Sequence, residues 1–254
     1  MQYHSVQEKD LVIDLSDGKR IHGYLRGKLE NVNGVIVMMH GLTGSPKSVL
    51  QYLGSRYLHE QGFSTLCLAM YDVGESYRTI FDCDINVHIR DFEEVVAHLQ
   101  KSGVKKIFGV GHSYGGLTIL GSKAKVSGAV LWDPTHGLAF EHDNSDKFPH
   151  VTYGPYRIDT SGKGYVYPEA IAKYNESLGD NSLWAEGKGY PIKFIAAGGG
   201  VLKDSIKKYL EIADEPKSYI EIEGASHDFT DTDAIITQLF VETAGWFHNL
   251  NDDK

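Results

Sequence analysis

The stretch from residue 107 to residue 116 constrains the fold of this chain more than any other. It reads IFGVGHSYGG, an apolar run that passes through a serine between two glycines toward a helix beginning at about Leu117. A strand that turns sharply into a helix brings backbone close to backbone around Ser113, so positions 111 and 115 must lack a Cβ. The pattern predicts a strand, a tight turn with Ser113 at its tip, and a helix whose first N–H groups face the same point.

Apolar runs alternate with helical patterns on both sides of this turn. Strands are predicted at residues 34–39, 63–68, 107–110, 128–132, 191–197 and 218–222, and helices at about 47–61, 84–101, 205–212 and 231–249. The continuous apolar runs are typical of strands buried on both faces. Strand–helix alternation of this kind favours a parallel sheet with helices on both faces.

The N-terminal part of the chain carries a hairpin signal. Two β-prone runs, residues 11–15 and 21–25, flank Ser16-Asp17-Gly18-Lys19. Asp-Gly between such runs is a strong indication of a tight hairpin turn. We therefore expect an antiparallel hairpin at the edge of the main sheet.

Composition limits the partners that this chain can have. The net charge of −9 argues against a nucleic-acid backbone or an anionic membrane surface as the main partner. Its two cysteines, Cys67 and Cys83, make neither a disulfide framework nor a zinc site. We find no signal peptide at the N-terminus and no apolar run near the ~20 residues that span a membrane. We expect a cytoplasmic protein with no stable membrane association.

Two motifs resemble those of a known superfamily. Residues 111–115, GHSYG, resemble the nucleophile elbow of the α/β-hydrolase superfamily. Residues 40–44, HGLTG, look like the HGFTG stretch of cinnamoyl and feruloyl esterase-like carboxylesterases, where we expect His40 to shape the loop. The resemblance covers nearly the whole chain. It implies an α/β-hydrolase fold in one domain, residues 1–254, with a mostly parallel eight-stranded sheet and helices on both faces.

The resemblance also implies a set of site residues. Ser113 corresponds to the nucleophile, and His227, within the EGASHDF segment of residues 223–229, corresponds to the catalytic base. The N–H groups of Leu42 and Tyr114 correspond to the oxyanion hole, which holds the negative charge of a tetrahedral intermediate. No metal and no organic cofactor is implied.

The acid of the triad has two candidates. The superfamily usually takes it from the loop after the strand at residues 192–197, where Asp204 is the only acid, preceded by a glycine-rich stretch. Asp133, at the end of the preceding strand, is the alternative because some members place the acid there. Asp228 is set aside, since it is adjacent to His227 and neighbouring side chains diverge in an extended loop. We expect Asp204, with Asp133 as its competitor.

Residues 134–190 differ in texture from the rest of the chain. They are polar, rich in glycine and aromatic residues, and show no strong periodicity before residues 168–178. An insertion after the sixth strand is where the superfamily places its cap. One interpretation is a surface loop whose aromatic residues pack on the core. We favour the other, a lid whose inner face forms the substrate pocket, because long loops of this kind are usually functional.

The expected function is that of a serine hydrolase. Ser113, an acid and His227 would cleave a small-molecule carboxylic ester through an acyl-enzyme intermediate. An acyl thioesterase or acyltransferase would use the same groups and is the alternative. A catalytically silent ligand-binding member of the fold is a third hypothesis, from a different class. The residues give no indication of the natural substrate, the acyl-chain length or the oligomeric state.

Overall fold

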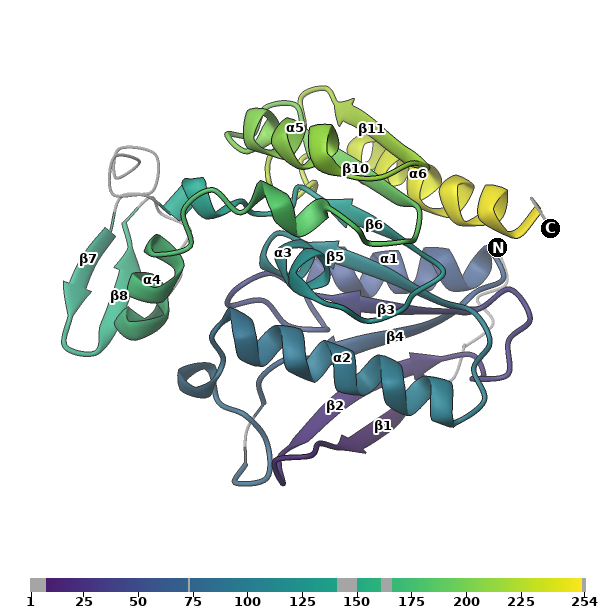
Figure 1. Ribbon diagram of the computed structural model, residues 1–254, viewed down its shortest axis with the longest axis horizontal. Helices are drawn as coiled ribbons and strands as arrows, with labels where there is room; N and C mark the ends of the chain where they lie inside the picture. The colour runs from purple at the N-terminus through teal and green to yellow at the C-terminus, as the bar shows by residue number, and fades with distance from the viewer. Residues whose placement is uncertain (1–7, 73, 141–149, 161–165, 253–254) are drawn as a thin grey trace.

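The computed structural model describes residues 8–72, 74–140, 150–160 and 166–252 (Figure 1). Its centre is an eight-stranded sheet in the order β1-β2-β4-β3-β5-β6-β10-β11. The strands are β1 Glu8–Asp14, β2 Arg20–Arg26, β3 Val35–Met39, β4 Ser64–Ala69, β5 Ile107–His112, β6 Gly128–Trp132, β10 Ile192–Ala197 and β11 Lys217–Ile222. All neighbours from β4 to β11 are parallel. The prediction of a mostly parallel eight-stranded sheet is confirmed.

The predicted N-terminal hairpin lies at one edge of this sheet. β1 and β2 pair antiparallel, with Asp14 opposite Arg20 at the turn, and β2 pairs antiparallel with β4. Gly18 in the turn adopts a φ of 83°, a conformation that glycine takes without strain. The hairpin therefore closes the side of the sheet that is far from β10 and β11.

Helices cover both faces of the sheet, as expected. α1 (Val49–Glu60) and α6 (Asp233–Asp252) pack on one face, and α2 (Ile85–Lys101), α3 (Tyr114–Gly121) and α5 (Lys203–Ile212) pack on the other. Within the described residues, no helix combines the length and the apolar composition that crossing a membrane requires.

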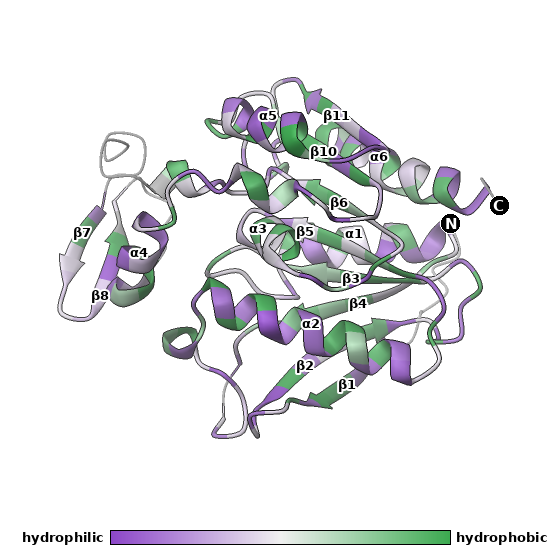
Figure 2. Cartoon of the chain, viewed as in Figure 1, coloured by the Kyte–Doolittle hydropathy of each residue, from purple (hydrophilic) through white to green (hydrophobic). Residues whose placement is uncertain are grey.

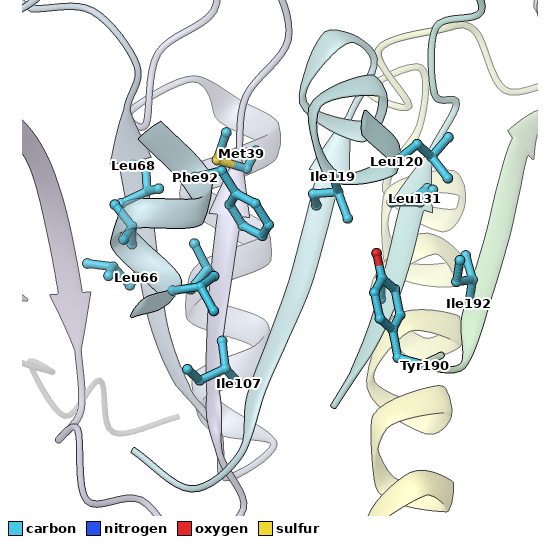
Figure 3. Packing of buried hydrophobic residues seen from close by; sticks show 14 of the residues in the cluster. Met39, Leu66, Leu68, Phe92, Ile107, Ile119, Leu120, Leu131, Tyr190 and Ile192 are labelled. Atoms are coloured by element: carbon cyan, nitrogen blue, oxygen red, sulfur yellow. The ribbon is translucent and has the colours of Figure 1, made fainter. Parts of the chain in front are cut away.

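The alternation of side chains along the central strands builds one core on each face. In β3, Val37 and Met39 join the cluster under α2, α3 and α5, whereas Ile36 and Met38 join the cluster under α1 and α6. Figure 3 shows part of the first cluster, with Phe92 of α2 near the strand residues. Figure 2 shows hydrophilic and hydrophobic residues alternating along α2, as expected of a helix with one face on the sheet.

Helix boundaries follow local signals. The side chain of Asp84 caps α2 by accepting a hydrogen bond of 3.0 Å from the N–H of Val87. α3 begins at Tyr114, three residues before the predicted start at Leu117. Only Ser113 separates the end of β5 from this helix, so the turn is tighter than the sequence suggested.

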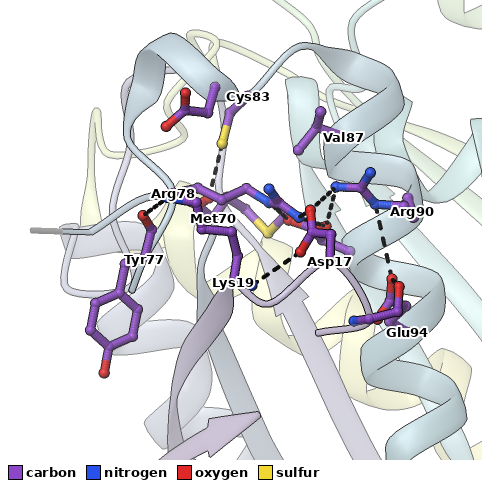
Figure 4. A network of polar contacts seen from close by, with 12 residues as sticks. Asp17, Lys19, Met70, Tyr77, Arg78, Cys83, Val87, Arg90 and Glu94 are labelled. Carbon is purple, nitrogen blue, oxygen red and sulfur yellow. Dashed lines mark hydrogen bonds and ion pairs between the residues drawn. The ribbon is translucent and has the colours of Figure 1, made fainter. Parts of the chain in front are cut away.

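A polar network ties the β1–β2 turn to α2 (Figure 4). The guanidinium of Arg78 pairs with the buried carboxylate of Asp91 on α2 and lies 2.8 Å from Asp17 of the turn. Arg90 reaches Asp17 at 3.0 Å and Glu94 at 3.9 Å. The segment that carries Arg78, between β4 and α2, therefore holds the edge hairpin against the helix layer.

The segment between β6 and β10, residues 134–190, has its own small fold. Its strands β7 (His150–Tyr153), β8 (Tyr156–Asp159) and β9 (Val166–Pro168) form an antiparallel sheet, followed by α4 (Glu169–Glu176). Figure 1 shows β7, β8 and α4 standing to one side of the main sheet. Buried Arg157 of β8 joins sheet to helix through ion pairs with Glu169, at 3.0 Å, and Glu176. We call this segment the insertion.

The insertion is closed at its base by a contact between its own two ends. There the side-chain oxygen of Asn181 accepts a hydrogen bond of 2.7 Å from the N–H of Gly137. Farther along, the α4 residues Tyr174 and Asn175 make hydrogen bonds with α2 and α3, described below. Two aromatic residues expected in the lid, Phe148 and Tyr165, lie outside the described residues. Tyr153 is 75% exposed, so the aromatic side chains of the insertion do not share one buried face.

Candidate active site

Ser113 lies at the tip of the turn between β5 and α3. Its backbone has φ 54° and ψ −118°, a strained combination for a residue with a Cβ. A Cβ at Gly111 would lie 2.5 Å from the carbonyl of Gly115, and a Cβ at Gly115 would lie 2.4 Å from the carbonyl oxygen of Met39. Both glycines are therefore required by close backbone approach, as the sequence pattern predicts.

The structure brings Ser113, His227 and Asp133 together. His227 Nε2 is 2.9 Å from Ser113 Oγ, and His227 Nδ1 is 2.6 Å from Asp133 Oδ2. An ionised carboxylate only accepts hydrogen bonds, so the proton of a neutral His227 sits on Nδ1. Nε2 then carries a lone pair directed at the serine, which donates its hydroxyl proton to it. This order of donors and acceptors lets a serine become a nucleophile.

Asp133 is held from several directions. It is fully buried, directly after β6, and its backbone has a φ of 41°. Its Oδ1 accepts a hydrogen bond of 3.0 Å from the N–H of Ala197, and its own N–H donates to Ile195 at 2.7 Å. Both carboxylate oxygens thus have a partner, and the side chain has one orientation, toward His227.

The prediction that Asp204 accompanies His227 is wrong. The Asp204 side chain is 86% exposed in the first turn of α5, where it lies 3.8 Å from Lys207. The loop before it, residues 198–203, passes close to the site but carries no acid. A Cβ at Gly200 would lie 3.4 Å from Asp133 Oδ2. The acid in contact with His227 is Asp133, which was the alternative candidate.

The loop after β3 lies against Ser113. A Cβ at Gly41 would be 3.1 Å from Ser113 Cβ and 3.5 Å from its Oγ, which places Leu42, the next residue, at the rim of the site. Tyr114 is the first residue of α3, directly after Ser113. Of the two residues expected to form an oxyanion hole, Leu42 therefore lies in the loop after β3 and Tyr114 lies at the start of α3.

His40 shapes this loop, as expected. It is buried, its Nδ1 donates to the carbonyl of Gly41 at 2.8 Å, and its Nε2 accepts from the N–H of Met70 at 3.2 Å. Burial lowers the pKa of His40 to about 4, so the ring stays neutral and can accept at Nε2. The imidazole therefore braces the Gly41 turn beside Ser113.

Two further side chains at this site, those of Thr135 and His112, were not predicted from the sequence. Thr135 Oγ1 lies 3.1 Å from Ser113 Oγ. His112 Nε2 donates to the carbonyl of His227 at 2.8 Å, and the two rings are 4.8 Å apart. Burial, and then the neighbouring His227, lower the pKa of His112 to about 4. The signal for Thr135 was its place two residues after Asp133, since the ends of adjacent parallel strands meet at one edge of the sheet.

Strained backbone gathers at the same place. Among the described residues, the non-glycine residues with positive φ are Thr43, Ser113, Asp133 and Phe229. Each belongs to the site or lies within two residues of one of its members. Such conformations cost about 1–3 kcal/mol each and persist only where the surroundings impose them. Their clustering marks this edge of the sheet as a functional site.

An apolar cluster adjoins Ser113 on the side of the insertion. Its buried members are Ile85, Tyr114 and Leu117, and the partly buried side chains packed on them are Leu42, Ile89, Tyr174, Leu178 and Trp184. Tyr114 donates its hydroxyl to Asn175 of α4 at 2.9 Å, and Asn86 donates to the Tyr174 hydroxyl at 2.6 Å. The insertion thus contacts the residue that follows Ser113. The described residues contain no group of three or more side chains suited to a metal ion.

Comparisons with known proteins agree with this fold. A family model described as "Alpha/beta hydrolase family" matches residues 36–234. Est1E from Butyrivibrio proteoclasticus, solved with ferulic acid, superposes with a TM-score of 0.73 at 16% identity over 94% of this chain and 98% of that one. GrgF from Penicillium sp. sh18 gives 0.74 at 14% identity over 96% and 98%, and an esterase domain from Rhodothermus marinus gives 0.70 at 14% over 94% and 97%. No curated protein matches the sequence.

Proposed function

The chain belongs to the alpha/beta hydrolase family, and from that premise we propose that it is a serine hydrolase that cleaves carboxylic esters through an acyl-enzyme on Ser113. The observation that carries the proposal is the continuous contact from Ser113 through His227 to Asp133, with distances of 2.9 and 2.6 Å. Serine alone is a poor nucleophile at neutral pH, and an adjacent oriented base removes that obstacle.

Acylation begins when Ser113 Oγ attacks the carbonyl carbon of the ester. His227 Nε2 takes the hydroxyl proton, and Asp133 stabilises the imidazolium that forms. The alcohol leaves with a proton returned by His227, so that the acyl group remains on Ser113. Water then enters, gives a proton to His227 and attacks the acyl carbon. The C–Oγ bond breaks, His227 returns the proton to Ser113 Oγ, and the acid is released.

Stabilisation of the oxyanion is assigned to backbone N–H groups. Leu42 follows Gly41, which lies against Ser113, and Tyr114 begins α3 directly after Ser113. Fixed N–H donors at such positions are worth about 3–4 kcal/mol each toward the transition state. The strained turn at Ser113 supports the assignment because it aims the N-terminus of α3 at the reacting carbonyl.

The apolar cluster beside Ser113 is the proposed seat of the acyl or alcohol group. Leu42, Tyr174 and Trp184 bring apolar surface to it from the β3 loop and the insertion. This composition suits a short acyl or aromatic ester better than a long-chain triglyceride. One of the superposed structures is an esterase domain, and another, Est1E, was solved with ferulic acid bound, which supports the same class.

The experiment must also distinguish ester hydrolysis from two other functions. Thioester cleavage and acyl transfer would use the same serine, histidine and N–H groups. A silent ligand-binding role is disfavoured because the serine, the histidine and the acid are all in contact.

Covalent labelling tests the proposal. The purified protein should react with a fluorophosphonate probe at one site, and Ser113→Ala should abolish labelling and cut kcat by about a thousandfold to a millionfold. A panel of model esters and acyl thioesters of graded chain length identifies the preferred bond. Ester hydrolysis retained by folded Ser113→Ala, with no labelling of the wild type, would refute the assignment.

A further inference from the structure

Thr135 stands next to the atom that reacts, and its backbone is fixed at both ends. Its N–H donates to the carbonyl of Ser113 at 3.1 Å, and its own carbonyl accepts the hydroxyl of Tyr209 at 3.1 Å. The residue is only 7% exposed. The side-chain oxygen is thereby placed 3.1 Å from Ser113 Oγ by a backbone that has little freedom to move.

Counting donors fixes the direction of that hydrogen bond. The carboxylate of Asp133 accepts from His227 Nδ1, so His227 Nε2 has only a lone pair to offer. Ser113 must therefore donate its one hydroxyl proton to Nε2. Its oxygen can then only accept from Thr135. In the resting site the Thr135 hydroxyl is a donor to the nucleophilic oxygen, and within the described residues it has no other hydrogen-bond partner.

The value of this donor changes along the reaction. In the acyl-enzyme, Ser113 Oγ is an ester oxygen, which is a weak acceptor. When the water-derived tetrahedral intermediate collapses, the C–Oγ bond breaks and its electron pair moves to Oγ. His227, protonated by the attacking water, then returns the proton to Oγ. A hydrogen bond to a developing negative charge is roughly twice as strong as one to a neutral oxygen.

Acylation gains less from the same contact. There the hydrogen bond from Thr135 already exists in the free enzyme, because the serine hydroxyl oxygen accepts it before any bond is made. Only interactions that are stronger in the transition state than in the preceding ground state accelerate a step. The contact should therefore favour breakdown of the acyl-enzyme over its formation.

We propose that Thr135 is a further catalytic residue of this site, whose hydroxyl stabilises Ser113 Oγ as the leaving group of deacylation. The proton of Thr135 is not transferred; it remains on Oγ1 throughout. The proposal rests on the proposed function, since it requires an acyl-enzyme on Ser113.

The test separates the two half-reactions. Stopped-flow measurements with a p-nitrophenyl ester give the acylation rate constant from the initial burst and the deacylation rate constant from the steady state. The variants are Thr135→Val, which keeps the shape and removes the hydroxyl, and Thr135→Ser, which keeps the hydroxyl. Thr135→Ala covers the case in which the valine methyl displaces Ser113. Thermal melts check that every variant is folded. The fluorophosphonate labelling rate is measured for each variant as a second readout of attack by Ser113.

Removal of the hydroxyl should lower the deacylation rate constant by about tenfold, the effect of one hydrogen bond to a charged group. Acylation and labelling should change by less than about threefold, and intact-mass spectrometry should show more acyl-enzyme at steady state. Thr135→Ser should restore deacylation to within about threefold of wild type.

Four outcomes overturn the inference. Three of them are equal loss in both half-reactions, a larger loss in acylation, and no loss in either. A serine variant as slow as the valine variant also overturns it, since the methyl and not the hydroxyl would then matter. A wild-type protein that is never acylated refutes the proposed function itself, whereas a normal burst with unchanged deacylation in Thr135→Val refutes only the role of Thr135.

Discussion

The turns that follow β6 and β10 begin at the same edge of the sheet, in hydrogen-bonded neighbouring strands, yet they have opposite characters. The β6 turn carries Asp133, fully buried and in contact with His227. The β10 turn carries three successive glycines, residues 198–200, and its first acid, Asp204, is 86% exposed.

Backbone room explains the difference. A Cβ at Gly198 would lie 2.7 Å from the carbonyl oxygen of Ile222, and Gly199 donates its N–H to the carbonyl of Ala225 at 2.9 Å. The β10 turn therefore packs directly against the loop that carries His227. It leaves no space for a side chain at Gly198. The acid is supplied from one strand farther away, whose side chain reaches across.

The largest expected effect is the loss of activity when the β6 acid is made neutral. Asp133→Asn should lower kcat by about ten-thousandfold while the fold persists, because the amide favours the wrong tautomer of His227. Steady-state kinetics with a model ester, on variants with matched thermal melts, give the ranking. An equal or larger loss in Asp204→Asn would reverse the comparison.

A smaller effect is expected when the acid is moved from one turn to the other. In an Asp133→Ala background, Gly200→Asp should raise kcat about tenfold, since an acid there would approach the position of Asp133 Oδ2, 3.4 Å from the Cβ site. Recovery stays partial because that Cβ is 3.1 Å from Ala197. Gly200→Asn in the same background is the matched control, and equal rates for the two variants would show that no acid function had moved.

The β6 turn should also contribute more than the β10 turn to the loss of folding stability at acid pH. It contains His136, and burial lowers the pKa of this imidazole from its usual 6.5 to about 4. The unfolded chain then binds more protons than the native one between these values, so stability falls as pH drops from about 6.5 to about 4. Buried His40, His88 and His112, with pKa values lowered to about 4, 3 and 4, add to the same trend.

Chemical denaturation at pH 7 and pH 5 measures how much His136 contributes to this loss of stability. His136→Gln should lose less unfolding free energy between these pH values than wild type does, by about 1 kcal/mol. A parallel decline in the two proteins would mean that His136 protonates as readily in the native state as in the unfolded chain.

The smallest effect belongs to Asp204. Its carboxylate lies in the first turn of α5 near Lys207, so Asp204→Asn should cost about 0.3–1 kcal/mol of stability through the helix dipole. kcat should stay within about twofold of wild type. Denaturation curves and ester kinetics on the same preparation measure both effects. Asp214→Asn is the control, because Asp214 is also exposed but lies after the end of α5.

Much of the fold was predictable because its signals are local. The glycines around Ser113, the apolar runs of β3 to β6 and the Asp84 cap act over a few residues, and the structure has the strands and helices that they indicate. Ser113 and His227 could be chosen for the same reason, each within a recognisable loop.

The acid in contact with His227 could not be chosen from local signals. Asp133 and Asp204 both follow a strand, and what separates them is the distance of each turn from the His227 loop, which depends on tertiary packing. The strands of the insertion were missed because they are short and partly exposed. They are held by the Arg157 ion pairs instead of an apolar face, so no periodic pattern announces them.

The point where the insertion leaves and rejoins the sheet has an evolutionary consequence. Because β6 and β10 are hydrogen-bonded neighbours, the sheet is complete without the chain that links them. The contact between Gly137 and Asn181 closes the base of that excursion. Between those two residues the sequence can drift, lengthen or be exchanged by recombination with no hydrogen bond of the main sheet at stake. Selection on the proposed substrate contacts of the insertion and selection for a folded body therefore fall largely on different parts of one gene.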